Sequence, residues 1–169
     1  MTYVSHYDSP LGGITMTSDG AALTGLWFDG QKYFPEGLPA GSHACTQAAG
    51  RVFAQAAEWL DVFFSGREPD FTPPLHPEGS DFRKAVWRIL LSIPRGQTLT
   101  YGEIAARIAG ERGLPRMSAQ AVGGAVGHNP VSIIIPCHRV IGSDGSPTGY
   151  AGGLERKRRL LELEGVLLS

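Results

Sequence analysis

Four prolines stand close together near the middle of this chain of 169 residues and limit what the segment around them can form. Pro69, Pro73, Pro74 and Pro77 all lie within residues 67–79. Proline fixes the backbone angle φ and has no N–H group, so this density excludes a helix or a central strand. We therefore predict a linker that separates two domains, residues 1–79 with the linker included and residues 80–169.

The residues before the linker are predicted to form a small α/β domain. Runs rich in β-branched and aromatic residues cover residues 3–7, 13–17 and 22–28, and turn signals separate them. Residues 31–42 carry glycine, proline and charge and are predicted to form a loop. Over residues 45–64 apolar side chains recur every three or four positions, which indicates a helix with one apolar face. We expect an antiparallel meander with one helix.

Short helices are predicted after the linker. They cover residues 82–91, 101–109, 119–127 and 154–164. Thr100 and Glu103 form a capping box, and Ser118 can cap the next helix. The two middle helices, joined by a turn at residues 110–117, form a helix-turn-helix candidate. The apolar residues 131–135 are predicted to form a buried extended segment.

Charge is divided unevenly along the chain. The net charge is −1 overall, but it is −7 for residues 1–81 and +6 for residues 82–169. Either the basic half faces a polyanion or the two halves attract each other. No apolar run has the length of a membrane span, and the N-terminus lacks the order of a signal peptide. Two cysteines, Cys45 and Cys137, are too few for a disulfide framework, so we expect a cytoplasmic protein with reduced thiols.

Cys137 has the sequence neighbours of a reactive cysteine. Pro136 ends the apolar run and forces a turn, and His138 and Arg139 follow directly. Either cation would favour the thiolate, which is the nucleophilic form of cysteine. The alternative is a buried structural cysteine, because neighbouring side chains in an extended chain point apart and need not meet.

Glu164 is predicted to lie on the buried face of the last helix. Leu160 and Leu161 precede it by four and three residues, which places all three on one face. A buried acid needs a partner, and a histidine would complete a Glu–His–Cys triad that activates a nucleophile. The alternative is a solvated glutamate at a frayed helix end.

The helix predicted at residues 119–127 has unusually small side chains. Gly123 and Gly124 are consecutive, and a helical glycine costs about 1 kcal/mol relative to alanine. Another chain or a ligand therefore has to come close to this helix. Close packing on a neighbouring helix and entry into a narrow groove of DNA are both compatible with this pattern.

Together these motifs resemble the O6-alkylguanine-DNA alkyltransferase family. The resemblance rests on the run Pro136-Cys137-His138-Arg139-Val140, with Asn129-Pro130 before it, Gly149-Tyr150 after it and Asp8-Ser9-Pro10-Leu11-Gly12 near the start. It implies a ribonuclease H-like N-terminal α/β domain and a mostly helical, winged-helix-like C-terminal domain with the helix-turn-helix. The cysteine that accepts the alkyl group in the family is present here as Cys137.

The resemblance also implies the chemistry. The alkylated guanine is flipped out of the duplex, and the Cys137 thiolate attacks the alkyl carbon by in-line displacement. Glu164 orients His138, which takes the Cys137 proton through a water, and Tyr101 donates to the leaving base at N3. The thioether product cannot be cleaved by any group in the site, so each molecule is expected to react once.

Further roles follow from the same resemblance. The backbone N–H of Ala151 holds the base oxygen O6, the carbonyls of Cys137 and Val140 accept from the exocyclic amine, Asn129 braces the turn behind the site, and Tyr150 forms a wall of the pocket. The residues expected to contact DNA are Thr100, Ser118, Ala119, Gln120, Gly123, Gly124 and Arg139.

Two positions depart from the family pattern. Gln120 stands where many members carry an arginine that fills the space left by the flipped base, and residues 111–113 lengthen the turn of the helix-turn-helix. The positions matching the zinc ligands of some members include Asp19 and Thr24. The remaining candidates, His6, His43, Cys45 and His76, have no metal-ligand spacing. We predict no metal, no cofactor and a monomer that acts on double-stranded DNA carrying alkylated guanine. The sequence leaves open whether O4-alkylthymine is also accepted.

Two other functions fit parts of the sequence. A DNA-binding regulator whose Cys137 senses alkylation or oxidation would use the same helix-turn-helix, but nothing indicates a dimer that reads a palindrome. A cysteine hydrolase would turn over repeatedly, but no oxyanion-binding loop is evident.

Overall fold

The computed structural model describes residues 2–38 and 47–166 and divides into two compact units. The first unit runs to Glu78 and includes Pro130–Ser132, and the second comprises Gly79–Asn129 and the chain from Ile133 onwards. Predictions for His43, Cys45 and the first residues of the predicted helix at 45–64 lie outside the described residues. No helix in the described ranges has the length and hydropathy needed to cross a membrane.

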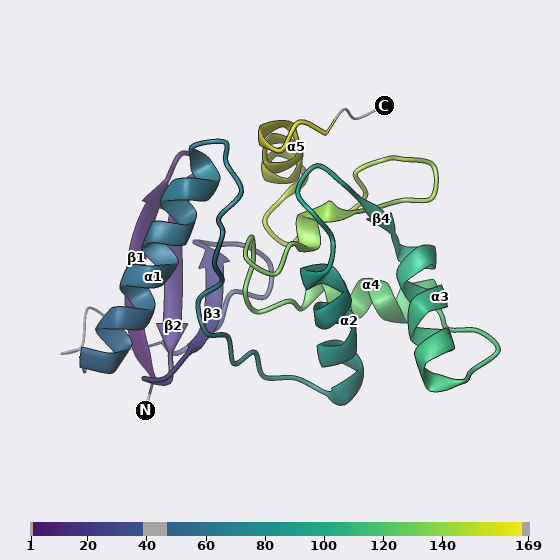
Figure 1. Ribbon diagram of the computed structural model, residues 1–169, viewed down its shortest axis with the longest axis horizontal. Helices are drawn as coiled ribbons and strands as arrows, with labels where there is room; N and C mark the ends of the chain where they lie inside the picture. The colour runs from purple at the N-terminus through teal and green to yellow at the C-terminus, as the bar shows by residue number, and fades with distance from the viewer. Residues whose placement is uncertain (1, 39–46, 167–169) are drawn as a thin grey trace. The chain divides into compact units, whose positions relative to one another are not determined.

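The first unit is an antiparallel meander with one helix against it (Figure 1). Its strands are β1 (Tyr3–Ser9), β2 (Gly12–Ser18) and β3 (Leu23–Phe28), and its helix is α1 (Gln47–Phe64). Each strand has the predicted position, and β1 and β2 are longer at the hairpin because Asp8 and Ser9 pair with Gly13 and Gly12. The α/β architecture predicted for this half is confirmed.

Alternating side chains of the meander supply its core. Ile14 faces Phe28 and Met16 faces Leu26 across neighbouring strands, and all four side chains are buried. Because side chains alternate between the two faces of a strand, this row points to one face of the sheet. The apolar stripe of α1, which includes the stacked rings of Trp59 and Phe63, is buried as well.

The proline-rich segment forms neither helix nor regular strand, but it is not a free linker. The Leu23 N–H donates to the Pro74 carbonyl at 2.8 Å, and the His76 N–H donates to the Leu23 carbonyl at 2.9 Å. Farther along β3, the backbone of Leu26 bonds in the same way to Pro130 and Ser132. These bonds explain why residues 130–132, which the sequence analysis assigns to the second domain, belong to the first unit.

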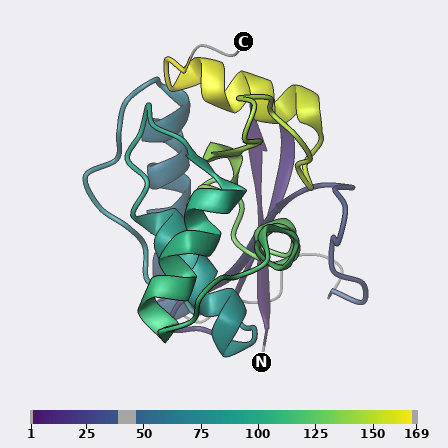
Figure 2. The same ribbon diagram turned by 90° about the vertical axis from the view of Figure 1, so that its right-hand side faces the viewer.

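The second unit contains most of the helices. Its elements are α2 (Asp81–Leu91), β4 (Leu99–Thr100), α3 (Tyr101–Arg112), α4 (Ala119–Gly127), the 3-10 helix η1 (Cys137–Arg139), β5 (Val140–Ile141) and α5 (Leu154–Leu163). Strands β4 and β5 pair in parallel, and Figure 2 shows α3 and α4 as neighbouring helices. The Trp87 indole on α2 donates to the Ala125 carbonyl of α4 at 2.9 Å, and this hydrogen bond links the two helices.

The helix-turn-helix has a longer first helix than predicted. Helix α3 continues to Arg112 instead of residue 109 and ends at Gly113, whose φ of 66° suits glycine at a C-cap. The predicted stop at Gly110 is wrong because one glycine in a helix costs only about 1 kcal/mol, which tertiary packing overcomes. The connecting turn is therefore shorter, from Gly113 to Ser118, and Ser118 caps α4 as predicted.

Residues 131–135 are buried but are not extended, so this part of the prediction is wrong. The chain turns here, and Ile133 has a φ of 70°, which is rare for a β-branched residue. The turn brings the Ile135 carbonyl back to the Asn129 side-chain amide, which donates to it at 2.7 Å. An apolar run shows burial, but it does not show whether the backbone turns inside the core.

Candidate active site

Cys137 begins a single turn of 3-10 helix directly after Pro136. The Cys137 N–H donates to the Ile135 carbonyl at 2.8 Å, and the Arg139 N–H donates to the Pro136 carbonyl at 2.9 Å. These bonds form the tight turn that the sequence predicts at Pro136. The Cys137 residue is only 5% exposed, so its side chain lies in the interior of the second unit.

The surroundings of the thiol act on its pKa in opposite directions. Burial raises the pKa of Cys137, while hydrogen bonding from Asn129 and Tyr150 and the charge of Lys157 lower it. The Tyr150 hydroxyl is buried beside the sulfur, and this burial raises the pKa of the hydroxyl above its ordinary value. The resting thiol is therefore protonated and needs a base before it can act as a nucleophile.

His138 and Glu164 form the buried pair that the sequence predicts. His138 Nε2 lies 2.9 Å from Glu164 Oε1, and neither side chain is exposed. Burial lowers the pKa of His138, although Glu164 opposes this effect. The imidazole is therefore neutral, and because the carboxylate accepts the hydrogen of Nε2, the basic nitrogen of the ring is Nδ1.

Arg139 does not belong to a DNA-binding surface, so that prediction is wrong. Its Nε lies 3.1 Å and 2.9 Å from the two carboxylate oxygens of Glu164, Nη2 also donates to Glu164, and Nη1 donates to the Ile93 carbonyl at 2.6 Å. The turn of η1 directs the guanidinium into the unit, where its hydrogen-bond donors are used. It cannot favour the Cys137 thiolate in the way its sequence position suggests.

Glu164 is consequently held by two partners. Burial opposes its ionisation, but hydrogen bonds from His138 and Arg139 bring the pKa of Glu164 down to about 2. The carboxylate stays ionised at neutral pH and fixes the ring of His138.

Lys157 is a site residue that the sequence analysis does not identify. Its side chain is fully buried on α5, and its Nζ donates to the Gly149 carbonyl at 3.2 Å. Its spacing from Leu160, Leu161 and Glu164 is three, four and seven residues, which places it on the same buried face. That spacing was the available signal.

The other predicted pocket residues lie in the same unit. Asn129 is buried and braces the turn through Ile135, and Val140 is buried where β5 pairs with Leu99 of β4. Tyr150 and Ala151 lie in the loop before α5, and Ala151 is half-buried.

Among the described residues, no group of three or more His, Cys, Asp or Glu side chains could hold a metal ion.

Tyr101 lies at the first position of α3, next to the face of α4 that was predicted to contact DNA. A Cβ built on Gly123 would lie 3.9 Å from the Tyr101 ring, and the Tyr101 hydroxyl is 3.5 Å from the Thr148 hydroxyl. The hydroxyls of Thr100 and Ser118 cap α3 and α4 by accepting from Glu103 N and Ala121 N, respectively.

The outer face of α4 is exposed and almost without side chains. Ala119, Gln120 and Gly124 are exposed, and Gln120 is the longest of them. A Cβ on Gly124 would have nothing within 4 Å, and one on Gly123 would have only the ordinary contact with Tyr101. Packing within the unit therefore does not explain why these residues are glycine, which favours close approach of a partner.

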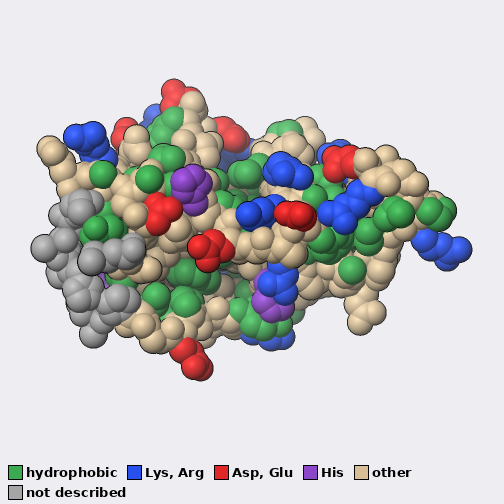
Figure 3. Space-filling view, turned by 90° about the horizontal axis from the view of Figure 1, so that it is seen from below, with side chains coloured by type: hydrophobic (Ala, Val, Ile, Leu, Met, Phe, Trp, Pro, Cys, Tyr) green, Lys and Arg blue, Asp and Glu red, His purple; other side chains and the backbone are tan. Residues whose placement is uncertain are grey.

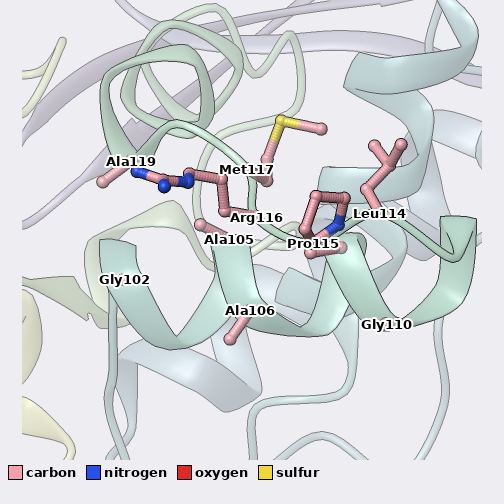
Figure 4. A pocket seen from close by; sticks show the side chains of 10 residues that line it. Gly102, Ala105, Ala106, Gly110, Leu114, Pro115, Arg116, Met117 and Ala119 are labelled. Carbon is pink, nitrogen blue, oxygen red and sulfur yellow. The ribbon is translucent and has the colours of Figure 1, made fainter.

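A shallow hollow of about 460 Å³ lies beside the start of α4 (Figure 4). Small residues of α3, among them Ala105 and Ala106, line one side, and the turn from Leu114 to Met117 lines the other. Arg116 in this turn reaches toward Ala119 and makes no ion pair with any described residue. Figure 3 shows one face of the molecule, on which Lys and Arg side chains of the second unit stand among exposed apolar ones.

The buried Cys137 thiol lies next to a His–Glu pair, in a unit whose helix-turn-helix exposes a helix face with few side chains. These two features define a class of protein that has a cysteine nucleophile and a helix able to enter a groove of its partner. Two family models match the chain: the ribonuclease-like domain of 6-O-methylguanine DNA methyltransferase over residues 2–77 and its DNA binding domain over residues 81–166. The chain belongs to the 6-O-methylguanine DNA methyltransferase family, and the resemblance inferred from the sequence is confirmed.

Individual relatives agree with this assignment. The methylated-DNA–protein-cysteine methyltransferase of Mycobacterium tuberculosis is 45% identical over 162 residues, covering 94% of this chain and 92% of the relative. The protein of the same name from Haemophilus influenzae is 41% identical over 97% of this chain and 87% of its own length. The crystal structure of Mycobacterium tuberculosis OGT in complex with DNA matches with a TM-score of 0.78 and 42% identity, covering 94% of this chain and 90% of that one.

Proposed function

We propose that this chain repairs DNA by moving the alkyl group of O6-alkylguanine irreversibly onto Cys137. The observation that carries the proposal is the buried Cys137 thiol in the turn that also presents His138 to Glu164. Family membership supplies the substrate class, and a relative crystallised with DNA supports the partner.

His138 is the base in this proposal. Its Nδ1 takes the Cys137 proton through a water, while Nε2 keeps its hydrogen bond to Glu164. The ring becomes positively charged when it takes the proton, and the ionised Glu164 stabilises that charge. Because Arg139 also holds Glu164, the carboxylate remains in position during the transfer.

Protonation of the leaving guanine balances the displacement. The sulfur forms a bond to the alkyl carbon, the bond from that carbon to O6 breaks, and the electron pair goes to guanine. Tyr101 donates to N3 of the leaving base, and the N–H of Ala151 holds O6. Only a flipped base brings the alkyl carbon to a buried sulfur, and Tyr150 is proposed as a wall of the pocket.

The outer face of α4 is proposed as the DNA contact, with Thr100, Ser118, Ala119, Gln120, Gly123 and Gly124 as its residues. Gln120 is proposed to fill the space of the flipped base, since it is the longest side chain on the exposed start of the helix. The protein is further proposed to act as a monomer in the cytoplasm, where a reducing environment keeps Cys137 as a thiol.

Intact mass after reaction tests the proposal. The protein is mixed with duplex DNA containing O6-methylguanine, and we expect one methyl group on Cys137 and an equal amount of repaired DNA. An excess of DNA should not give more than one transfer per molecule. Unchanged protein beside methylated DNA would contradict the proposal, and repeated turnover would indicate a hydrolase.

A further inference from the structure

The loop between β5 and α5 lies beside Tyr101, the residue proposed above to donate to the leaving base. Strand β5 ends at Ile141, which pairs with Thr100 of β4, and Tyr101 follows as the first residue of α3. The chain that leaves β5 therefore starts next to the beginning of α3. Farther along this loop, the Thr148 hydroxyl donates to the Tyr101 hydroxyl at 3.5 Å. The steps proposed above assign no role to Thr148.

Hydrogen bonds inside the loop close it without the Thr148 side chain. The Gly142 N–H donates to the Ser146 carbonyl at 2.8 Å, and the Gly145 N–H donates to the Gly142 carbonyl at 2.9 Å. The Ser146 N–H also donates to the Asp144 carboxylate at 3.0 Å. Because these bonds define the path of the backbone, the Thr148 hydroxyl is not needed to hold the loop together.

The methyl group of Thr148 occupies a confined position. Gly142 is buried, and a Cβ built on it would lie only 3.0 Å from Thr148 Cγ2, so the absence of a side chain at Gly142 leaves room for this methyl group. Threonine is β-branched, and rotation about its χ1 angle is restricted. Packing of the methyl group against Gly142 therefore also fixes the direction of the hydroxyl, which points to Tyr101.

A hydrogen bond from Thr148 decides what the Tyr101 hydroxyl can do. A tyrosine hydroxyl has one hydrogen to donate and an oxygen that can accept. When Thr148 donates to this oxygen, the hydrogen of Tyr101 remains for another acceptor. A hydroxyl that accepts a hydrogen bond is also polarised into a stronger donor. The two residues thus form a chain of hydroxyls that ends at the hydrogen of Tyr101.

We propose that Thr148 is a positioning residue that directs the Tyr101 hydrogen toward the leaving base. Negative charge develops on guanine as its bond to the alkyl carbon breaks, and the aligned dipoles of the two hydroxyls stabilise this charge. The hydrogen offered to the base is that of Tyr101, while Thr148 keeps its own hydrogen and no covalent bond to Thr148 forms or breaks. The inference rests on the proposed function, in which Tyr101 donates to N3.

The distance between the two hydroxyls fits a pair that tightens when DNA binds. An oxygen–oxygen distance of 3.5 Å is long for a hydrogen bond, and Thr148 is exposed. Hydrogen bonds at catalytic groups are often long in a free protein and shorten in the complex with substrate. A base placed against Tyr101 would exclude water from the pair and strengthen its hydrogen bond.

Two other roles for Thr148 predict different results. If Thr148 braced the loop, its loss would lower the melting temperature. If it contacted DNA directly, its loss would weaken binding. Neither role acts through the Tyr101 hydroxyl, so the loss would be the same with or without that hydroxyl. A positioning role instead predicts slower transfer at saturating DNA, and only while the Tyr101 hydroxyl is present.

The test is a double-mutant cycle of Thr148→Val, Tyr101→Phe and the protein with both changes. Single-turnover methyl transfer is followed by intact mass with saturating O6-methylguanine duplex, and affinity is measured with the unmodified duplex of the same sequence. We expect Thr148→Val to slow transfer about three- to tenfold, as for the loss of one hydrogen bond, with unchanged affinity and melting temperature. In the Tyr101→Phe protein the same change should slow transfer less than about twofold.

Thr148→Ser keeps the hydroxyl without the methyl group that orients it, so it should recover part of the rate lost in Thr148→Val. Thr98→Val removes a hydroxyl from the segment before β4 and should transfer like the wild type. With an active wild type, the inference is overturned by an unchanged rate in Thr148→Val or in Tyr101→Phe, by an equal loss in the Tyr101→Phe protein, or by Thr148→Ser no faster than Thr148→Val. A wild type that accepts no methyl group refutes the proposed function and this inference with it.

Discussion

Arg139 donates hydrogen bonds to both carboxylate oxygens of Glu164, the group that also accepts from His138. The negative charge of Glu164 is thus balanced by a permanent cation before any proton moves. His138 can remain neutral beside it, because the carboxylate does not depend on a protonated imidazole. The arrangement keeps a base available next to the thiol at neutral pH.

The hydrogen bonds that Glu164 accepts from His138 and Arg139 predict how the stability of the fold depends on pH. Its pKa of about 2 in the folded protein lies below the usual 4.5, so the folded state favours the ionised form. This contribution is complete above about pH 4.5 and is lost as pH falls toward 2, and it amounts to about 3 kcal/mol. Urea unfolding from pH 6 to pH 2.5 measures it.

Glu164→Gln should flatten this pH dependence and lower stability at neutral pH, since Arg139 loses its counter-ion. Glu162→Gln, which alters an exposed acid of α5, is the matched control and should follow the wild type. Equal slopes for all three proteins would show that Glu164 is not the group that titrates.

Removing the Arg139 side chain should destabilise the protein without acting directly on DNA. Arg139→Met leaves Glu164 with His138 alone, and breaking a buried pair in this way costs about 3–5 kcal/mol. Arg139→Lys keeps the charge but loses part of the hydrogen bonding, so it should remain folded for binding measurements. We expect normal DNA affinity with reduced stability. Reduced DNA affinity with normal stability would return Arg139 to the set of DNA-contact residues.

The contrast between Glu164 and Arg139 shows what the sequence could and could not predict. Glu164 was found from helical spacing, because Leu160 and Leu161 mark the buried face of α5. Arg139 was assigned wrongly because its partner is 25 residues away, and the direction of its side chain depends on the 3-10 turn. Periodicity reports which face is buried, but it carries no information on which distant groups meet there.

The same limit applies to the backbone. The linker prolines, the meander and the caps at Thr100 and Ser118 follow from local rules and were predicted. The left-handed Ile133 and the bonds of Leu26 to residues 130–132 depend on tertiary contacts, and no local pattern indicates them. Lys157 lies between these cases, because its spacing was visible but a lysine is ordinarily expected at the surface.

Replacing the nucleophile should separate transfer from binding. Cys137→Ala removes only the sulfur from a buried position, so the fold and the α4 surface should be preserved. We expect no methyl transfer in the mass measurement and unchanged affinity for O6-methylguanine DNA in a gel-shift titration. Loss of both properties would mean that Cys137 is mainly structural.

Arg116 is expected to contribute to DNA affinity through charge. It is exposed beside the start of α4 and makes no ion pair with the described residues. Affinity should weaken as salt increases, and Arg116→Gln should reduce the slope of log affinity against log salt by about one. Arg51→Gln on α1, an exposed arginine of the first unit, is the control and should leave the slope unchanged.

Replacing Gly124 with a larger residue should raise the stability of the protein and weaken its binding to DNA. A side chain at this position meets nothing within 4 Å, so Gly124→Leu is accommodated and should stabilise the protein by roughly 0.5–1 kcal/mol through helix propensity. If α4 enters a groove of DNA, the same side chain blocks it, and affinity should fall more than tenfold, about 1.4 kcal/mol.

Gly50→Leu provides the matched comparison, because Gly50 lies in α1 and also has nothing within 4 Å. It should give a similar gain in stability and leave DNA affinity unchanged. If Gly124→Leu binds DNA as tightly as Gly50→Leu, the bare face of α4 is not the surface that meets the duplex, and the DNA-contact residues proposed on α4 would have to be placed elsewhere in the second unit.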